Sequence, residues 1–178
     1  MTWSGIRCKL ENEYLAESLR GHIQYFAASY SKCPDHEGRA AVRLDGEEIL
    51  KSNYFDMVRA QYYAERRIRG ENPLISYKEA WVKSGLAALE DGCFDQRDFY
   101  AAFTEFDNQS IEDSLDSENA LVRMFAVLDR RVGKRRLEKL ADRIAGEPEW
   151  LREFYMIRLR AEGIKYGKSN AESISAEI

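Results

Sequence analysis

Two adjacent residues, Asp45 and Gly46, constrain the fold of this chain more than any other feature of its sequence. An Asp-Gly pair is favoured at the centre of a type I′ turn, because both central residues of that turn need a positive φ. Residues 39–44 before the pair alternate loosely between apolar and polar side chains, and residues 47–51 after it carry Ile49. The pair therefore predicts a β-hairpin, which needs further partners because an isolated hairpin is only marginally stable.

The residues before the hairpin supply those partners. Residues 22–31 are rich in aromatic residues and predict another strand. The segment 33–38 between the strands contains the turn formers proline, aspartate and glycine. Residues 3–19 predict an opening helix, because apolar side chains recur there at spacings of three and four. We therefore expect an N-terminal helix on a three-stranded antiparallel sheet formed by residues 22–51.

From residue 53 onward the apolar pattern is helical. We predict helices over 53–69 and 76–90, a third that begins at Asp95 or Asp98, a short turn of helix at 110–116, a helical pair over 117–145 and a last helix over 148–163. In the first two helices we expect the core side to carry Phe55, Val58, Tyr62, Ile68, Tyr77, Ala80, Trp81, Leu86 and Leu89. The expected fold class is α+β, with a mostly helical C-terminal half behind the sheet.

The length of 178 residues suits one ordinary domain or one domain with a helical appendage. A helix stop at Gly70 to Pro73 divides the chain into residues 1–70, with the sheet between two helices, and residues 74–166, a helical bundle packed on it. The two parts could equally form one continuous domain. Residues 167–178 are rich in Ser, Ala and Glu and predict a flexible tail.

The composition indicates a protein of a reducing compartment. The three cysteines, Cys8, Cys33 and Cys93, lie far apart and form no recognisable disulfide framework. The first residues lack the apolar core of a signal peptide, and nowhere do roughly 18 apolar residues follow one another, as a membrane-spanning helix requires. We therefore expect a cytoplasmic protein that binds no membrane.

The charges are distributed unevenly along the chain. The formal net charge is −4, which does not indicate a general polyanion-binding protein. Residues 90–118 contain ten acidic residues and one basic residue, a net charge of −9, and residues 123–143 contain eight basic and three acidic residues, a net charge of +5. Either the two segments neutralise each other within the fold, or each is a solvated helix face, or some of the cations form an edge that binds an anion.

The anion-binding hypothesis rests on five cations around Gly133. They are Arg130, Arg131, Lys134, Arg135 and Arg136. Backbone N–H groups that follow Gly133 would add to the attraction, because a helix N-terminus favours anions. The prediction is a non-enzymatic cytosolic binding or regulatory module that uses a basic helix–turn–helix edge and has no cofactor.

The same edge indicates the class of partner. An acidic protein or a phosphate-bearing molecule would satisfy it. Nucleic acid would satisfy it too but is less favoured, because the aromatic residues alternate poorly with basic ones and no ribonucleoprotein motif occurs. The sequence leaves the oligomeric state open.

Cys33 and His36 provide an alternative, a small hydrolase or transferase. Nucleophilic catalysis needs a cysteine or serine beside a histidine, and the chain has only His22 and His36. The same residues, with Asp35 and Cys8, suggest metal ligands, but the second regularly spaced pair of a zinc site is missing. We therefore predict no metal site and assign no catalytic residue.

Four segments together resemble a family of small uncharacterised bacterial proteins. They are the Trp3-Ser4 helix start, the Gly38-Arg39 strand, Asp45-Gly46-x-Glu48-Ile49, and the ten residues 128–137, Leu-Asp-Arg-Arg-Val-Gly-Lys-Arg-Arg-Leu. The last segment is the most specific, and the similarity covers residues 3–160. The resemblance implies a bacterial cytoplasmic protein and transfers no catalytic residues to this chain.

Overall fold

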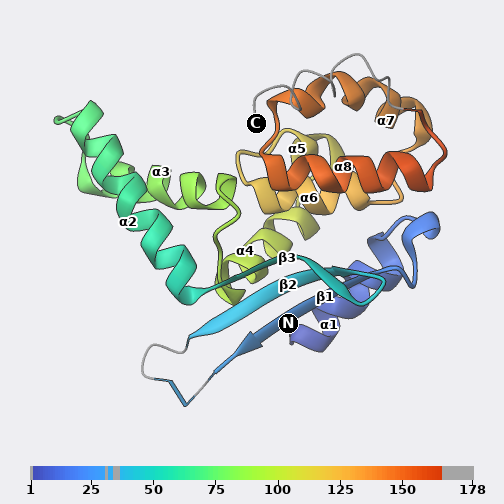
Figure 1. The fold of residues 1–178 in the computed structure, drawn as a ribbon, viewed down its shortest axis with the longest axis horizontal. Helices are drawn as coiled ribbons and strands as arrows, with labels where there is room; N and C mark the ends of the chain where they lie inside the picture. Colours follow the sequence, from blue (N-terminus) through green and yellow to red (C-terminus); the bar gives the residue numbers. More distant parts are fainter. Residues whose placement is uncertain (1, 31, 34–36, 166–178) are drawn as a thin grey trace, which may run out of the picture.

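The structure is a computed structural model that describes residues 2–30, 32–33 and 37–165. Its three strands are β1 (Ile23–Ser29), β2 (Gly38–Leu44) and β3 (Glu47–Asn53), and they form one antiparallel sheet in the order β1-β2-β3 (Figure 1). The register places Val42 between Tyr25 and Leu50. Asp45 and Gly46 have φ values of 52° and 91°. The predicted tight hairpin and the three-stranded meander are therefore confirmed.

The opening segment corrects the prediction of one helix over 3–19. It consists of α1 (Trp3–Cys8), a π-helical stretch η1 (Lys9–Tyr14) and a short 3₁₀ helix η2 (Glu17–Leu19). The helix stops because Leu15 forms an antiparallel bridge with Asp129, with backbone hydrogen bonds on both sides of it. A contact with a segment more than a hundred residues away thus overrides the local helical pattern.

The remaining elements are helical, as predicted. They are α2 (Tyr54–Glu71), α3 (Tyr77–Glu90), α4 (Gln96–Asp107), α5 (Ile111–Leu115), α6 (Ala120–Leu128), α7 (Lys134–Leu140), the 3₁₀ helix η3 (Ala141–Gly146) and α8 (Glu149–Ala161). None of the described helices is long and apolar enough to cross a membrane. The N-terminal helix, the antiparallel sheet and the helical C-terminal half confirm the α+β class. The predicted tail at 167–178 lies outside the described residues.

The core is built around α6. This helix packs against α4, α5 and α8, while α4 also packs on the sheet. Aromatic rings join these layers: Phe125 meets Phe99 edge-on at 5.1 Å between ring centroids and Tyr25 at 5.7 Å. All nine residues of α6 are buried, so this helix has no side that faces water.

Arg123 is the one charged residue of α6, and it is neutralised inside the fold. Its Nε donates to Glu147 at 2.9 Å and its Nη2 donates to Glu90 at 2.8 Å. Its Nη1 donates to the Ser117 carbonyl oxygen at 2.8 Å. The bonds to Glu147 and Glu90 tie α6 to the turn before α8 and to the end of α3, and the third bond ties it to the loop that precedes α6.

The α2–α3 hairpin projects away from the rest of the molecule (Figure 1). On α2 only Ala64 is buried, whereas Phe55, Val58 and Tyr62 are exposed and Ile68 is half-buried. The prediction that these four side chains face the core is therefore wrong. The periodicity marks an apolar face correctly, but α2 packs mainly against α3, and no other element of the described residues covers that face.

The second helix of the hairpin is only partly as predicted. Ala80 and Leu89 are buried and Leu86 is half-buried, whereas Tyr77 and Trp81 are about half or more exposed. The buried residues lie mostly toward the body of the molecule, and the exposed aromatic residues lie toward the tip of the hairpin. The predicted boundary at 70–74 falls at that tip, between two helices that pack on each other.

Helix α4 begins with a reciprocal cap. Asp95 accepts hydrogen bonds from the N–H groups of Arg97 and Asp98, and the Asp98 carboxylate accepts the N–H of Asp95 at 2.9 Å. Burial raises the pKa of Asp98 to about 6, and the neighbouring Asp95 carboxylate adds to the rise. The cap therefore holds a carboxyl group that gains a proton more easily in the folded state than in the unfolded chain.

We predict that Arg123→Ala destabilises the protein by about 3–5 kcal/mol, because it leaves the buried Glu147 carboxylate without its cationic partner and with only the hydrogen bond from the Tyr155 hydroxyl. Arg143→Ala is the control. It breaks an exposed ion pair with Asp116 and should cost at most about 1 kcal/mol. Urea denaturation measures both free energies of unfolding, and equal costs for the two variants would contradict the role given to Arg123.

We also predict that the stability of the wild-type protein has a contribution from Asp98 that is lost as the pH rises. The raised pKa means that the unfolded state releases this proton near pH 4, whereas the folded state holds it up to about pH 6. Between these values the free energy of unfolding should fall more steeply in wild type than in Asp98→Asn. Urea denaturation at several pH values tests this, with the exposed Asp142→Asn as the control. The same slope in Asp98→Asn and wild type would count against it.

Candidate functional site

The predicted basic edge begins where the chain leaves α6. The amide of Ala16 donates to the Leu128 carbonyl oxygen at 2.9 Å, and the amide of Arg130 donates to the Tyr14 carbonyl oxygen at 2.8 Å. The loop from Asp129 to Gly133 is therefore fixed to the N-terminal segment, and the chain continues into α7 at the surface. This anchoring holds the five predicted cations close together, although their side chains have different surroundings.

Arg131 is neutralised by its own neighbour. Its Nη2 lies 2.8 Å from the fully buried Asp129 carboxylate, and its Nε donates to the same group at 3.0 Å. Its guanidinium lies 5.0 Å from the centre of the Tyr14 ring and 5.4 Å from that of Phe106. The hydrogen bond with Asp129 raises the pKa of Arg131 further. Arg131 thus secures the loop and is only partly available to a partner.

Tyr14 adds a second polar contact at the same place. Its hydroxyl donates to Asp107 at 2.5 Å, and Lys9 donates to the same carboxylate at 2.9 Å. Burial, followed by the bond to Asp107, raises the pKa of Tyr14 to about 12. Burial alone would raise the pKa of Asp107, but the bonds from Tyr14 and Lys9 outweigh it and hold that pKa below its ordinary value. The Asp107 carboxylate thus fixes the Tyr14 ring, on which the Arg131 guanidinium of the loop packs.

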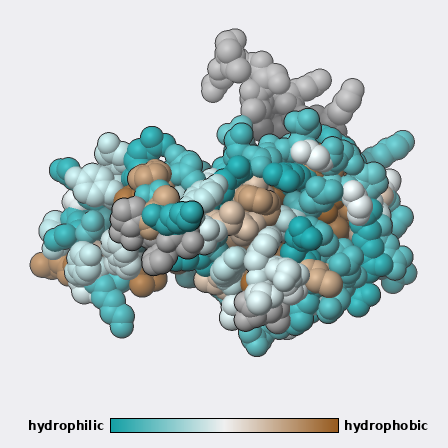
Figure 2. All heavy atoms as spheres, turned by 90° about the horizontal axis from the view of Figure 1, so that it is seen from below, coloured by the Kyte–Doolittle hydropathy of each residue, from teal (hydrophilic) through white to brown (hydrophobic). Residues whose placement is uncertain are grey.

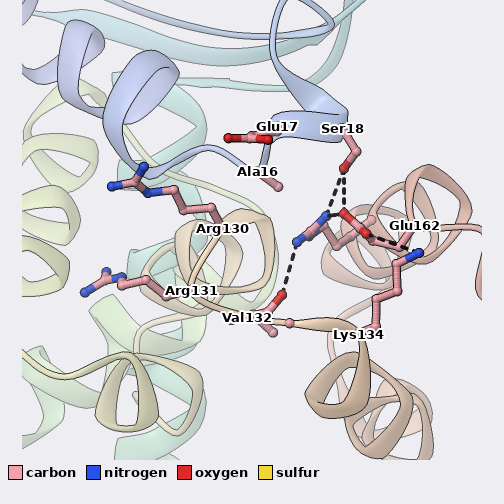
Figure 3. Close-up of a pocket in the computed structure, with 10 residues that line it drawn as sticks. Ala16, Glu17, Ser18, Arg130, Arg131, Val132, Lys134 and Glu162 are labelled. Carbon is pink, nitrogen blue, oxygen red and sulfur yellow. Dashed lines mark hydrogen bonds and ion pairs between the residues drawn. The ribbon is translucent and has the colours of Figure 1, made fainter.

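Two further cations have partial partners. Arg136 donates to Glu112 at 2.6 Å, and the two side chains are 39 % and 60 % exposed to solvent. Lys134 lies 3.9 Å from Glu162, at the limit of an ion pair (Figure 3). Glu162 also accepts hydrogen bonds from Ser18 and from the buried Arg158. The closest contacts of the Glu162 carboxylate are thus with Ser18 and Arg158, and the more distant Lys134 is only weakly neutralised.

Arg130 and Arg135 are exposed, and within the part of the chain that the structure describes their side chains have no ion pair or hydrogen bond. Figure 3 shows Arg130 extended to the same side as Arg131, away from Glu162. Lys139 is equally exposed and without a partner among the described residues. The sequence analysis counted Lys139 as basic but did not assign it to the edge. Its spacing of four from Arg135 was the signal, because residues four apart share one side of a helix.

The cations border two surface grooves. One is lined by residues of η2, the loop and α8, including Arg130, Arg158 and Glu162. The other, which we call the α7 groove, is lined by Arg131, Gly133, Lys134, Arg135, Arg136 and Lys139. No carboxylate of a described residue lines the α7 groove. The two grooves share Arg131, Gly133 and Lys134.

The backbone contributes little to this site. Helix α7 has seven residues and begins at Gly133 without a side-chain cap. The Arg136 and Leu137 amides already donate to the Gly133 carbonyl oxygen. So short a helix has a small dipole, so the side chains rather than the predicted helix start supply the attraction for an anion.

The acidic and basic segments meet at three points. Ion pairs join Arg123 to Glu90, Arg136 to Glu112 and Arg143 to Asp116. Mutual neutralisation of the two segments therefore explains part of the charge pattern but not all of it. Carboxylates of the acidic segment pair with Arg123, Arg136 and Arg143, and Asp129 pairs with Arg131. Three exposed cations have no carboxylate partner among the described residues, namely Arg130, Arg135 and Lys139.

The residues considered for a hydrolase, a transferase or a metal site form no catalytic or metal-binding arrangement among those that the structure describes. Cys33 is half-buried, and burial and Glu37 raise the pKa of its thiol, which lowers the thiolate fraction needed of a nucleophile. His36 and Asp35 lie outside the described residues. His22 directly precedes β1, at the end of the strand away from Cys33, and its Nδ1 is 2.6 Å from Asp45 in the hairpin turn. Within the described ranges no three His, Cys, Asp or Glu residues cluster as a metal site would require.

Comparison with known proteins gives one match. The model of the SF0329 protein family matches residues 2–159. No curated protein and no solved structure matches the chain. The matched range agrees with the resemblance to an uncharacterised family over residues 3–160, and a bacterial origin stays a prediction. Because the match covers most of the sequence, the chain belongs to the SF0329 protein family.

Proposed function

We propose that this protein is a binding module that holds an anionic partner against the α7 groove. The observation that carries the proposal is the lining of that groove, which contains five cations and, within the part of the chain that the structure describes, no carboxylate. Two of these cations, Arg135 and Lys139, have no carboxylate partner among the described residues. Their charges are balanced by solvent ions until a partner supplies anionic groups.

The arrangement suits an oxyanion. Guanidinium groups present several N–H donors in a planar fork that matches carboxylate and phosphate oxygens. Arg131 is held in place by Asp129, and Arg136 by Glu112, so part of the groove is already ordered before a partner arrives. Pre-ordered side chains lower the entropic cost of binding.

The partner that we favour carries phosphate groups. A phosphate monoester has a charge between about −1.5 and −2 and three strong acceptor oxygens, which several cations contact at once. An acidic protein segment offers single carboxylates and is the second choice. Nucleic acids are less favoured, because none of the described residues that line the α7 groove is an aromatic residue on which a base could stack.

The proposed place of action is the bacterial cytoplasm. Cys8, Cys33 and Cys93 are all free thiols, which fits a reducing compartment. The proposal is limited to binding, or regulation through binding, and assigns no reaction step to any residue.

We predict that Arg135→Ala/Lys139→Ala weakens binding of inorganic polyphosphate about tenfold, because two charge-assisted contacts are lost. The slope of affinity against salt concentration should fall as well. The matched control is Lys32→Ala/Arg160→Ala, which removes the same charge at exposed positions outside both grooves and outside the α2–α3 hairpin and should bind as wild type. Isothermal titration calorimetry with polyphosphate and with polyglutamate, at low and high salt, measures both affinities.

The two probes separate the partner classes. Tighter binding of polyphosphate than of polyglutamate, lost in the groove variant alone, supports a phosphate-bearing partner. The reverse preference would replace it by an acidic protein. If wild type binds neither probe, or if the control loses affinity as much as the groove variant, the proposed function is wrong.

A further inference from the structure

The exposed apolar side chains gather on the α2–α3 hairpin. Among the described residues nine large apolar side chains are exposed, and eight of them lie between Phe55 and Val82. On α2, Phe55, Tyr62 and Tyr63 are 63 %, 50 % and 65 % exposed. Figure 2 shows the hairpin as a smaller lobe with hydrophobic residues at its outer surface, beside a larger and mostly hydrophilic lobe. Monomeric proteins rarely expose so many large apolar groups together.

The interior of the hairpin is built from small side chains. Ala64 is the one buried residue of α2, and on α3 the buried stripe includes Ala80, Ser84 and Ala88. The two helices therefore approach each other through small groups, and the large aromatic groups stay outside. Helices of this length depend mainly on tertiary packing for stability, so a hairpin of this kind has an apolar surface that remains to be buried.

We propose that two copies of this chain pair through their α2–α3 hairpins about a two-fold axis and form a four-helix bundle. The exposed area agrees with this size of interface. A large apolar or aromatic side chain presents roughly 200 Å², so eight that are about half exposed offer about 800 Å², close to what each partner buries in a stable complex. A symmetric pair brings the same surface together from both copies.

The charge of the hairpin favours a copy of itself over a strongly charged partner. Residues 54–90 contain six basic and five acidic residues, so the hairpin is nearly neutral. On α2, Asp56 pairs with Arg59 and Glu65 pairs with Arg69. Most charges of the helix are thus balanced within it, which leaves the exposed aromatic side chains as the main source of attraction between two copies.

The aromatic groups are also arranged for contact. Phe55, Val58 and Tyr62 follow one another at spacings of three and four and form one stripe along the outer side of α2. The Arg66 guanidinium lies over the Tyr62 ring at 5.7 Å and donates to its hydroxyl at 3.0 Å, which holds that ring against the helix. Rigid aromatic anchors of this kind dominate the binding energy of interfaces.

Sedimentation velocity over a range of protein concentrations tests the proposal with the full chain. We expect wild type to sediment as a dimer, and Phe55→Glu/Tyr62→Glu to raise the dissociation constant at least about a hundredfold, because two anchors are replaced by charges. Tyr30→Glu is the matched control. It changes the one exposed large apolar residue outside the hairpin among those described, and it should leave the dimer intact.

The outcomes are distinct from those of the anion-binding test, because the hairpin and the α7 groove share no residue. Circular dichroism shows whether the double variant remains folded, and if it does not, the mass of wild type decides. A monomeric wild type at all concentrations, or a folded double variant that remains a dimer, would overturn the proposal. Equal dissociation in Tyr30→Glu and in the double variant would overturn it too.

Discussion

The fold depends on neutralising one buried cation. Helix α6 has no face toward water, and its Arg123 is stable there because Glu90 and Glu147 accept hydrogen bonds from its guanidinium on two sides and balance its charge. Those partners come from the end of α3 and from the turn before α8. One set of charge-assisted bonds therefore fixes the base of the hairpin and the last helix around the central helix.

The cations that follow Arg123 alternate between paired and unpaired side chains along the chain. Arg131 lies against aromatic rings and shares the buried Asp129, while Arg136 meets Glu112 at the surface. Arg135 and Lys139, on the outer side of α7, have no carboxylate partner among the described residues. This alternation explains how one basic segment both stabilises the fold and leaves exposed cations at the surface that we propose as a binding site.

Features that are local in sequence were predictable, and features that depend on distant contacts were not. Asp45 and Gly46 specify their turn by their own φ preferences, and the helix after Asp95 starts at a cap formed within four residues. Periodicity located α2 but could not show that Phe55 and Val58 face solvent, because burial depends on which element covers the helix. In the same way, the basic segment was evident from sequence, but its division into paired and unpaired cations required the positions of Glu112 and Asp129.

The central claim is that the outward cations of the α7 groove, and not the buried ones, meet the partner. The most direct measurement follows the arginine side-chain Nε–H signals by NMR during a titration with a phosphorylated ligand or inorganic polyphosphate. The account predicts that the signal of Arg135 shifts with ligand concentration, while the signal of Arg123 stays in place because its donors already bind Glu90 and Glu147. If the ligand binds the protein but the Arg135 signal does not shift, the claim that the α7 groove meets the partner is contradicted.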